Sequence, residues 1–460
     1  MTYSISNADN IRNVLKKDIR ALEEFCRETP PPEVAEVLSG LEPEEILKIL
    51  RHIKDESLKV EIFTYLPLDR QIALSEIFSK EELTSIISNM SHDDRVDLYK
   101  KMPENIKETL TRDLAKAERE DIIRLSSYQE GTAGAVMTSD YAMLQPNLTI
   151  LEAIDKLRRE APDKETIYYA YVVDDNRKLI GFVSLKDLII SPSYFKIENI
   201  METDVVSVHV NDDQEDVAKK IEKYDLIAIP VVDNNGVLLG IVTHDDAFDI
   251  IRQEQTEDVE KLMGITGEHE VGVYLKTPSF IHFKNRITWI LILAFLGIIT
   301  GMIVHKFENI LQQLTILAVY MPMLADTGGN TGSQSATVVI RALALGEITN
   351  RDILKVLFKE LKISVMIGCV LTIFVFLRVY IFTPTDKIPH LLPLINISIV
   401  IALALGIQTV TATLIGALLP LIVAKFKLDP AIIASPALTT IVDMTGLFIY
   451  FTMARFLLHF

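Results

Sequence analysis

Two apolar segments near the carboxyl end of the chain carry the residues that could do chemistry. The first, Ile310 to Ile340, has one formal charge, Asp326, and contains the polar, glycine-rich stretch 320–337, which reads YMPMLADTGGNTGSQSAT. The second, Ala431 to Ala454, has one charge, Asp443, near its middle. An ionisable group inside a bilayer costs at least ~2.5 kcal/mol, so such a group usually faces a cavity, a partner or an ion.

Glycine and proline interrupt the first segment at Pro322, Gly328, Gly329 and Gly332. They predict a broken helix, because both residue types release backbone carbonyls from the helical ladder, and inside a bilayer protein, water or an ion must satisfy those carbonyls. The alternative is a kinked helix whose small residues allow tight packing. Carbonyls and one carboxylate are hard oxygen ligands, which suit Mg²⁺, Ca²⁺ or Na⁺. We therefore expect a cation path.

The motif GGNTGSQS, followed later in the chain by SPALTTIVDMTGL, resembles the MgtE family of Mg²⁺ channels and transporters. One departure is Ser435, which stands where some family members carry Asn. We predict that the carboxylate of Asp443 attracts and holds the ion, that backbone oxygens of the break face it, and that two amide side chains brace the break. The predicted pore residues are Asp443, Gly328, Gly329, Asn330, Gln334 and Thr439.

The charge is divided unevenly along the 460 residues. Residues 1–270 hold 55 acidic and 32 basic residues, a net charge of −23, whereas residues 271–460 hold 8 and 14, a net charge of +6. A strongly acidic half argues against nucleic acid and for cationic partners. Cys26 and Cys369 lie in different halves, so no disulfide framework is indicated. We find no nucleophile–base pair and no phosphate loop, so an enzyme is not expected.

These features predict a multidomain protein: an all-α helical-repeat N domain, an α+β tandem CBS pair, a connecting helix and an all-α polytopic membrane domain with five transmembrane helices. The expected bounds are 1–130, 131–254, 245–280 and 281–460. Within 1–130, helix-start signals recur, in which Pro or Ser precedes an acid. They predict a small solenoid of short helices, which resembles the MgtE N-terminal domain. Its His92, like His244, is predicted to be a surface histidine rather than a zinc ligand.

Residues 137–254 contain an internal repeat with an offset of 59 residues. Val172-Val173-Asp174 matches Val231-Val232-Asp233, and Gly181 matches Gly240. Each copy predicts strand, helix, strand, turn, strand and helix, and the two resemble a tandem CBS-domain pair, named for cystathionine β-synthase. Such pairs usually sense ligands and dimerise, so a homodimer is expected.

Nucleotide binding is a further expectation from this resemblance. Ser184-x-x-Asp187 and Thr243-x-x-Asp246 resemble positions that hold a nucleotide ribose in some CBS pairs, although the motif also occurs in empty ones. Leu226 is aliphatic where an aromatic side chain would stack on adenine. ATP is the candidate ligand, and its predicted residues are Tyr169, Ser184 and Asp187.

An acid-rich helix, His244 to Phe280, is predicted to connect the CBS pair to the membrane domain. The resemblance implies a plug beside the pore whose acids bind regulatory Mg²⁺; otherwise the acids form a solvated face. The predicted regulatory residues are Asp93, Asp97, Asp213, Glu215, Asp225, Asp246, Asp249, Glu254, Glu257 and Asp258.

Five membrane spans are predicted, and Lys and Arg set their orientation. Nine basic residues flank one side and four the other, which places the N-terminal domains in the cytoplasm and the C-terminus outside the cell membrane. The run Leu391 to Ala424 is too long for a straight span, so we expect it to be tilted, bent or partly interfacial near Pro393 and Pro420. The expected spans are Ile287–Val304, Ile310–Ile340, Leu361–Phe382, Leu391–Ala424 and Ala431–Leu458.

The predicted function is Mg²⁺ uptake through a homodimeric channel or transporter in the lipid bilayer, closed by cytoplasmic Mg²⁺ bound to the N and CBS domains. Mg²⁺ is thus both the transported and the regulatory ion. Two alternatives remain: an ion-coupled carrier of Mg²⁺, Co²⁺ or Mn²⁺ with the same fold, or a membrane-tethered CBS sensor without transport.

Overall fold

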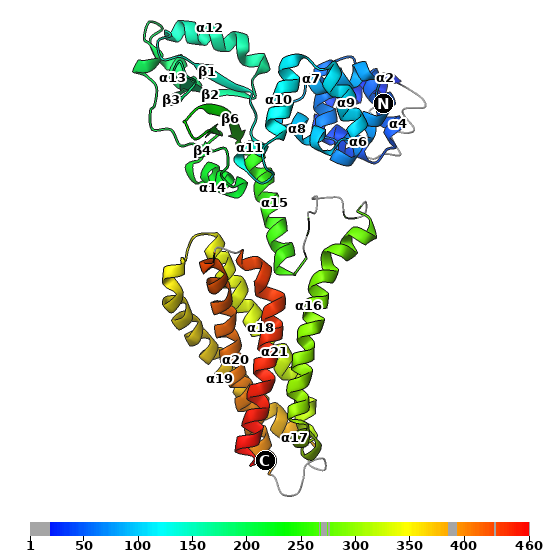
Figure 1. Ribbon diagram of the computed structural model, residues 1–460, viewed down its shortest axis with the longest axis vertical. Coiled ribbons are helices and arrows are strands. Elements are labelled where there is room, and N and C mark those ends of the chain that lie inside the picture. Colours follow the sequence, from blue (N-terminus) through cyan, green and yellow to red (C-terminus); the bar gives the residue numbers. More distant parts are fainter. Residues whose placement is uncertain are drawn as a thin grey trace. The chain divides into compact units, whose positions relative to one another are not determined.

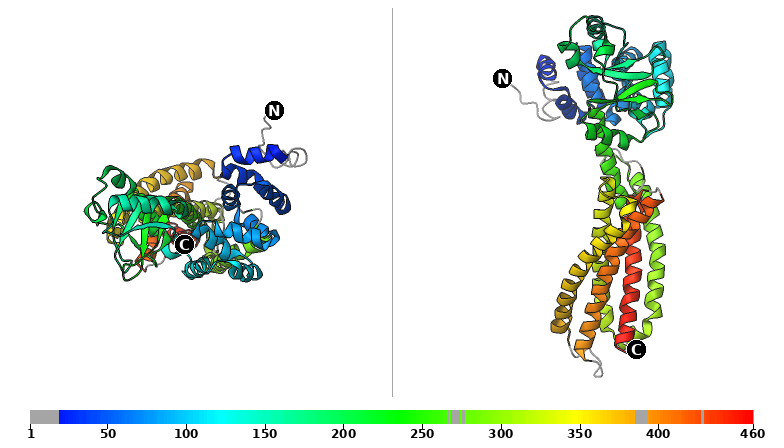
Figure 2. Two further views of the ribbon diagram at one scale, coloured as in Figure 1. Left: turned by 90° about the horizontal axis from the view of Figure 1, so that it is seen from above. Right: turned by 90° about the vertical axis from the view of Figure 1, so that its left-hand side faces the viewer.

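The computed structural model describes residues 19–265, 267, 274, 277–384, 393–426 and 429–459 of the chain. The contacts divide the chain into two compact units, Met1–Arg252 and Gln253–Phe460. The first unit holds the short N-terminal helices and two small sheets, and the second holds the long apolar helices (Figures 1 and 2).

Nine short helices open the described part of the first unit, and each helix from α2 to α8 packs against the helix two places further along the chain. That pattern makes a helical solenoid around one continuous apolar core, as predicted. The helices are α2 (Ile19–Glu28), α3 (Pro31–Ser39), α4 (Pro43–His52), α5 (Glu56–Thr64), α6 (Leu68–Ile77), α7 (Lys80–Ser88), α8 (His92–Lys101), α9 (Glu104–Asp113) and α10 (Lys116–Ser126).

The predicted helix starts are borne out at atomic detail. Ser79 caps α7 by accepting a hydrogen bond from Glu82 N, while Glu82 reaches back to Ser79 N. This reciprocal capping box satisfies two backbone donors at the helix end. Helix α5 begins without such a Pro or Ser signal, and its cap is Asp55, which accepts hydrogen bonds from two backbone N–H groups.

The sequence repeat folds into two similar sheets, each with one parallel and one antiparallel pairing. The first copy follows the short helix α11 (Ala133–Val136). The first copy comprises β1 (Tyr141–Leu144), α12 (Ile150–Glu160), β2 (Thr166–Val173), β3 (Leu179–Ser184) and α13 (Leu185–Ile190). The second comprises β4 (Val208–His209), α14 (Gln214–Tyr224), β5 (Ala228–Val232), β6 (Leu238–Thr243) and α15 (His244–Leu262).

Each copy is tied to the other through its entry segment. Phe182 of the first copy bridges Glu202, which enters the second copy, and Ile241 of the second bridges Thr138, which enters the first. The matched glycines permit this approach: a Cβ on Gly181 would lie 2.8 Å from the Glu202 carbonyl oxygen, and one on Gly240 would lie 2.6 Å from that of Thr138. The glycine that is repeated in both copies therefore lies where each copy contacts the entry segment of the other.

The connecting helix is shorter than predicted. Helix α15 ends at Leu262, and the next helix among the described residues begins at Ser279. Gly264 follows the helix with φ +70°, a left-handed conformation that ends helices, and Ile265 N bonds back to Glu260 O at 2.9 Å. The predicted continuation to Phe280 is therefore wrong, although part of 263–278 lies outside the described residues.

Helices α16 to α21 form most of the described part of the second unit and run side by side, apart from the short α17 (Figures 1 and 2). Helix α20 lies at the centre, against α18, α19 and α21, while α16 packs on α21. The helices are α16 (Ser279–Lys306), α17 (Glu308–Gln313), α18 (Ile316–Ala344), α19 (Ile353–Phe382), α20 (Leu394–Lys425) and α21 (Pro430–Leu457).

Among the described residues, four helical segments are long and apolar enough to cross a membrane: Ser279–Lys306, Ile353–Phe382, Leu394–Lys425 and Ala437–Leu457. The remaining predicted span, Ile310–Ile340, corresponds to α18, which is 29 residues long but carries the polar stretch. In the long apolar run Leu391–Ala424, Pro393 is the N-cap of α20, so the helix begins after that proline. Pro420 lies inside the helix. The chain is thus a multi-pass membrane protein.

Candidate functional site

Helix α18 is continuous through Pro322 and all three glycines. The predicted break is therefore wrong: the backbone of Gly328, Gly329 and Asn330 stays inside the helix and offers no row of released carbonyls. The Thr331 hydroxyl also donates to the Gly328 carbonyl oxygen at 3.2 Å. Glycine signals two things in a membrane helix, backbone freedom and close approach, and sequence alone does not separate them.

Close approach is what these glycines provide. A Cβ on Gly328 would lie 2.9 Å from Val442 Cγ1 of α21, and a Cβ on Gly416 of α20 would lie 2.2 Å from the Gly332 carbonyl oxygen. Small residues at these positions let α18, α20 and α21 pack with their backbones close together. The tight-packing alternative from the sequence is the one the structure bears out.

The polar residues of α18 lie on its other side. Asp326, Asn330 and Gln334 are all exposed, and their spacing of four residues places them along one face. We call these three residues the α18 polar stripe. Because they point out of the unit, the amides of Asn330 and Gln334 do not brace a break within it.

Asp443 lies in α21 and is half-buried. Its Oδ1 is enclosed and has no hydrogen-bond partner among the described residues. Thr439, one turn earlier, is exposed, and its Cγ2 lies 3.5 Å from the place a Gly329 Cβ would occupy. The structure therefore brings Thr439 and Val442, the residues around Asp443 on α21, against the glycine stretch of α18.

Two buried polar side chains in the same unit were missed. Gln408 of α20 is 1% exposed and donates from Nε2 to the Leu324 carbonyl oxygen at 3.0 Å. Glu360 of α19 is 8% exposed and accepts a 2.8 Å hydrogen bond from Ser335 Oγ of α18. Glu360 lies one residue before the predicted span Leu361–Phe382 and was therefore not considered as part of it. Gln408 carried a usable signal, because it is an amide within a long uncharged run.

In the first unit, acidic residues from α8 and α15 meet where the solenoid joins the CBS pair. Asp93 Oδ1 is enclosed without a hydrogen-bond partner among the described residues. Burial, and then the charges of Asp93 and Asp245, raise the pKa of Asp246 to about 8. The predicted regulatory residues Asp93 and Asp246, 153 positions apart in sequence, are therefore neighbours in space.

Several other predicted regulatory acids have local roles. Asp213 caps α14 by accepting from Glu215 N at 2.8 Å, and Glu215 pairs with Lys219 at 2.7 Å. Asp225 ends α14 in a left-handed conformation with φ 51°. Asp97 and Asp249 are exposed, while Glu254 and Asp258 are half-buried and have interactions of their own.

Glu257 belongs to a contact made by the end of α15. Lys261 Nζ lies 2.8 Å from Glu257 and 2.9 Å from Asp429, which precedes α21. Burial opposes the charge of Lys261, but its hydrogen bonds to Glu257 and Asp429 outweigh that effect and raise its pKa. Leu262 packs beside it on an apolar cluster of α18, α20 and α21. The end of the connecting helix is thus fixed to the membrane helices.

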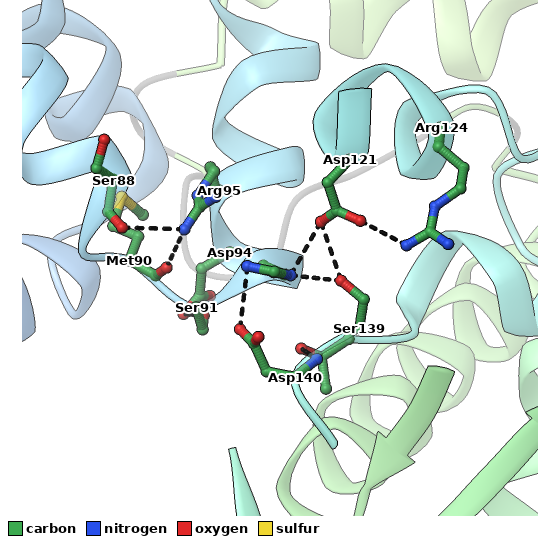
Figure 3. A network of polar contacts seen from close by, with 11 residues as sticks. Ser88, Met90, Ser91, Asp94, Arg95, Asp121, Arg124, Ser139 and Asp140 are labelled. Carbon is green, nitrogen blue, oxygen red and sulfur yellow. Dashed lines mark hydrogen bonds and ion pairs between the residues drawn. The ribbon is translucent and has the colours of Figure 1, made fainter. Parts of the chain in front are cut away.

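His92 is not the free surface histidine that the sequence suggested. Its Nδ1 lies 2.9 Å from Asp121 and its Nε2 lies 3.2 Å from Asp140, and the side chain is 23% exposed. Asp121, Ser139 and Asp140 converge around this ring (Figure 3). Burial opposes ionisation of Asp121, but the hydrogen bond and charge of His92 lower its pKa to about 2. One imidazole therefore joins α8, α10 and the strand entry of the CBS pair.

The predicted nucleotide residues lie together in the first CBS copy. Tyr169 and Ser184 face each other in the β2–β3 ladder. Ser184 Oγ donates to Asp187 at 2.5 Å and accepts from Asp187 N, so this pair also caps α13. Thr243 and Asp246 repeat the arrangement at the start of α15. Among the described residues, no group of three or more His, Cys, Asp or Glu side chains is arranged to hold a metal ion.

Comparison with known proteins agrees with this architecture. The family described as a divalent cation transporter, MgtE, matches residues 321–453. The MgtE intracellular N domain matches residues 29–131, and CBS domains match residues 133–193 and 197–253.

Whole-length relatives and solved structures extend the match. The chain is 36% identical over 454 residues to a magnesium transporter MgtE of Thermus thermophilus, covering 95% of this chain and 98% of that protein. It is 32% identical over 441 residues to the Bacillus subtilis magnesium transporter MgtE, covering 96% and 95%. The crystal structure of the cytosolic domain of the Mg²⁺ channel MgtE in complex with ATP matches with a TM-score of 0.50 and 32% identity, over 54% of this chain and 100% of that one. Both the near-complete coverage and the shared order of domains mean that this chain belongs to the MgtE family.

Proposed function

We propose that this chain transports Mg²⁺ across the cell membrane through a path at Asp443, and that cytoplasmic Mg²⁺ closes this path. The observation that carries the proposal is the enclosed Oδ1 of Asp443, which has no hydrogen-bond partner among the described residues and lies in a membrane helix whose Thr439 and Val442 contact the glycine face of α18. The whole-length relatives are named magnesium transporters, which supports the identity of the ion.

The chemistry of the site suits a hydrated divalent cation. Mg²⁺ releases its water reluctantly, so proteins hold it with one or two carboxylates and leave several waters in place. One carboxylate attracts the ion without stripping it, and weak contacts let it leave. Asp443 supplies the charge, and Thr439 lines the same face of α21 one turn away.

A second copy of the chain completes the path in this proposal. The α18 polar stripe is exposed in one copy, yet a row of polar side chains is costly against lipid. Pairing two copies about a two-fold axis would turn both stripes and both Asp443 residues toward a shared aqueous path. The apolar residues Ile189 and Ile190 on α13, exposed at 69% and 68%, offer the CBS pair a surface for the same dimer.

Regulation is assigned to the acidic first unit. Asp93, Asp245 and Asp246 bring like charges together, and a divalent cation among them would relieve the repulsion. Mg²⁺ binding there would favour the closed arrangement, and loss of Mg²⁺ would favour opening, through differential binding to two states. The excess of Lys and Arg on one side of the spans supports a cytoplasmic first unit and an outside C-terminus.

ATP is a second regulatory ligand in this proposal. Tyr169, Ser184 and Asp187 lie together, and the related cytosolic domain named above was crystallised with ATP. Ser184 already bonds to Asp187, so a ribose hydroxyl would have to share or replace that contact.

Flux measurements on purified protein in liposomes test the proposal. Asp443→Asn should reduce Mg²⁺ entry strongly, whereas Asp443→Glu should retain part of it. Asp352→Asn is the matched control, because Asp352 lies outside the helical core and pairs with Lys355 at 2.8 Å. Flux that requires a proton or Na⁺ gradient would instead establish the coupled carrier, and a folded protein without flux would establish the sensor. Normal Mg²⁺ flux in Asp443→Asn would contradict the site.

A further inference from the structure

Three lysines form a row at the start of α19. Lys355, Lys359 and Lys362 follow one another at spacings of four and three residues, so they lie on one face of the helix, and all three side chains are exposed. We call them the α19 basic row. The same face continues with Met366 and Ile373, which are 71% and 63% exposed. A basic surface therefore runs directly into an apolar surface on a helix that is long enough to cross a membrane.

The length of α19 places the basic row at the edge of the bilayer. The helix has 30 residues and is about 45 Å long, whereas the hydrocarbon core is ~30 Å thick, so its ends extend into the headgroup layers. The uncharged stretch 363–377 lies between Lys362 and Arg378. These two cations therefore lie near the two edges of the hydrocarbon core.

The side chains of both cations reach away from the middle of the helix. Lys362 Nζ lies 4.6 Å from the ring centroid of Phe358, which is four residues nearer the start of α19. Arg378 Cζ lies 4.9 Å from the ring centroid of Phe382, which is four residues nearer its end. Long cationic side chains at a membrane edge extend toward the headgroups in this way. The ammonium group of Lys362 is thus held at headgroup level by a ring of its own helix.

Two members of the basic row lack a counter-charge in the described part of the chain. Lys355 pairs with Asp352 at 2.8 Å. The acid beside Lys359 in sequence, Glu360, is buried and accepts a hydrogen bond from Ser335 instead. Neither Lys359 nor Lys362 forms an ion pair with another of the described residues. Two exposed ammonium groups about one turn apart are therefore available to an external anion.

We propose that Lys359 and Lys362 bind the headgroup phosphate of an anionic lipid, whose acyl chains lie along Met366 and Ile373. Lysine binds phosphate as a point charge, and each basic residue at a membrane surface attracts anionic lipid. A second copy of the chain fits this face poorly, because two-fold pairing would bring two rows of like charge together. The inference uses α19 alone and is independent of the ion path. The proposed orientation places the lipid in the cytoplasmic leaflet.

A tryptophan reporter tests the site in the full chain, reconstituted in phosphatidylcholine vesicles that contain phosphatidylglycerol as the minor lipid. Trp289 is the one tryptophan in the sequence, so Trp289→Phe with Met366→Trp leaves a single reporter beside the basic row. Bromine on the acyl chains of a lipid quenches a neighbouring tryptophan, and brominating each lipid in turn gives the lipid composition beside the reporter. We expect the phosphatidylglycerol share beside position 366 to exceed its share of the vesicle.

The other end of α19 supplies the matched reporter, Phe374→Trp with Trp289→Phe. Phe374 is 64% exposed and lies four residues from Arg378, as Met366 lies four residues from Lys362. Because Arg378 is a single cation rather than part of a row, the lipid share beside position 374 should follow the vesicle composition.

Two double variants, each made with the reporter at position 366, separate charge from folding. Lys359→Gln with Lys362→Gln should remove the excess, and each lysine lost should lower the relative affinity for phosphatidylglycerol about fivefold. Lys359→Arg with Lys362→Arg keeps both charges and should keep the excess.

Four outcomes would overturn the inference. Beside position 366, these are a lipid composition equal to that of the vesicle, or an excess that survives the Gln variant. An equal excess at position 374 would show a general surface charge instead of a site. Weak quenching by both brominated lipids at position 366 would show that protein covers this face.

Discussion

At the scale of single residues, the glycines of the membrane unit are the sharpest case. The structure gives two helical glycines with opposite surroundings: a Cβ on Gly416 would collide with the backbone oxygen of Gly332 at 2.2 Å, whereas a Cβ on Gly297 of α16 would meet nothing within 4 Å. Backbone cannot move aside as a flexible side chain can, so the two positions should respond differently to the same methyl group.

We expect Gly416→Ala to destabilise the membrane unit by ~1–3 kcal/mol, the usual cost of overpacking. Gly297→Ala should be neutral or slightly stabilising, because alanine has the higher helix propensity. The midpoint of thermal aggregation of the detergent-solubilised protein, read by size-exclusion chromatography, checks both. Equal midpoints for the two variants would mean that α18 and α20 do not approach closely at Gly332.

His92 supports a second prediction at this scale. Removing the ring in His92→Ala would leave Asp121 and Asp140 facing each other without the group that bonds to both. We expect faster amide hydrogen exchange in α8 and in the segment around Ser139. His52→Ala is the control, because the hydrogen bond of its Nδ1 among the described residues is to the Lys48 carbonyl oxygen of its own helix. If exchange around Ser139 matched the parent protein, the imidazole would not hold this junction.

At the scale of elements, the sequence predicted the helix starts and the equivalent strands of the repeat, because capping residues and periodicity determine these features. Ser79 and Glu82 identify the start of α7, and the repeated Gly181 and Gly240 identify equivalent strands of the CBS pair. Three features needed the structure. The continuity of α18 depends on how closely its neighbours approach, the burial of Gln408 depends on which face of α20 is central, and Asp93 meets Asp246 only through the fold.

The meeting of α8 and α15 predicts a dependence on pH. The pKa of Asp246 is raised to about 8 in the packed state, by burial first and then by Asp93 and Asp245, from an ordinary value near ~4 when exposed. The packed state therefore binds more protons between these two values, so its stability is full below about pH 4 and is lost as the pH rises toward 8. Without Mg²⁺, the amides of α8 and of the start of α15 should have higher protection factors at pH 6 than at pH 8.5, after division by the intrinsic exchange rate, which itself rises with pH.

Asp246→Asn removes this titration and should flatten the pH dependence, while Asp216→Asn on the exposed side of α14 should not. Millimolar Mg²⁺ should also flatten it in the parent protein, because the cation replaces the protons. A pH dependence that persisted unchanged in Asp246→Asn would locate the titrating group elsewhere.

At the scale of the whole molecule, the N-terminal and C-terminal parts of the chain carry opposite charge, and α15 runs from the first unit into the second. Residues 1–270 have a net charge of −23, and residues 271–460 have +6. The connecting helix α15 begins among the acids Asp245 and Asp246 and ends at Lys261, which contacts Asp429 of the membrane unit. The end of α15 is therefore held to the membrane helices, while its first turn carries Asp245 and Asp246.

The last prediction follows from that connection. If the acids only solvate the surface, removing the solenoid should change little besides solubility. If they bind Mg²⁺ across packed surfaces, several weak sites act together on one closed state, and each lost site shifts the balance between closed and open. Deleting residues 1–130 removes Asp93 and Asp97, and replacing Glu254, Glu257 and Asp258 by Ala changes the end of α15. In both variants we expect half-maximal closure of the Mg²⁺ path to need a higher cytoplasmic Mg²⁺ concentration than in the parent protein. In the parent protein, we expect α15 to resist protease in millimolar Mg²⁺ and to be cleaved in chelator. A truncated protein that closed at the parent Mg²⁺ concentration would place the sensor outside the solenoid, in the CBS pair or the membrane unit, because those are the parts it retains.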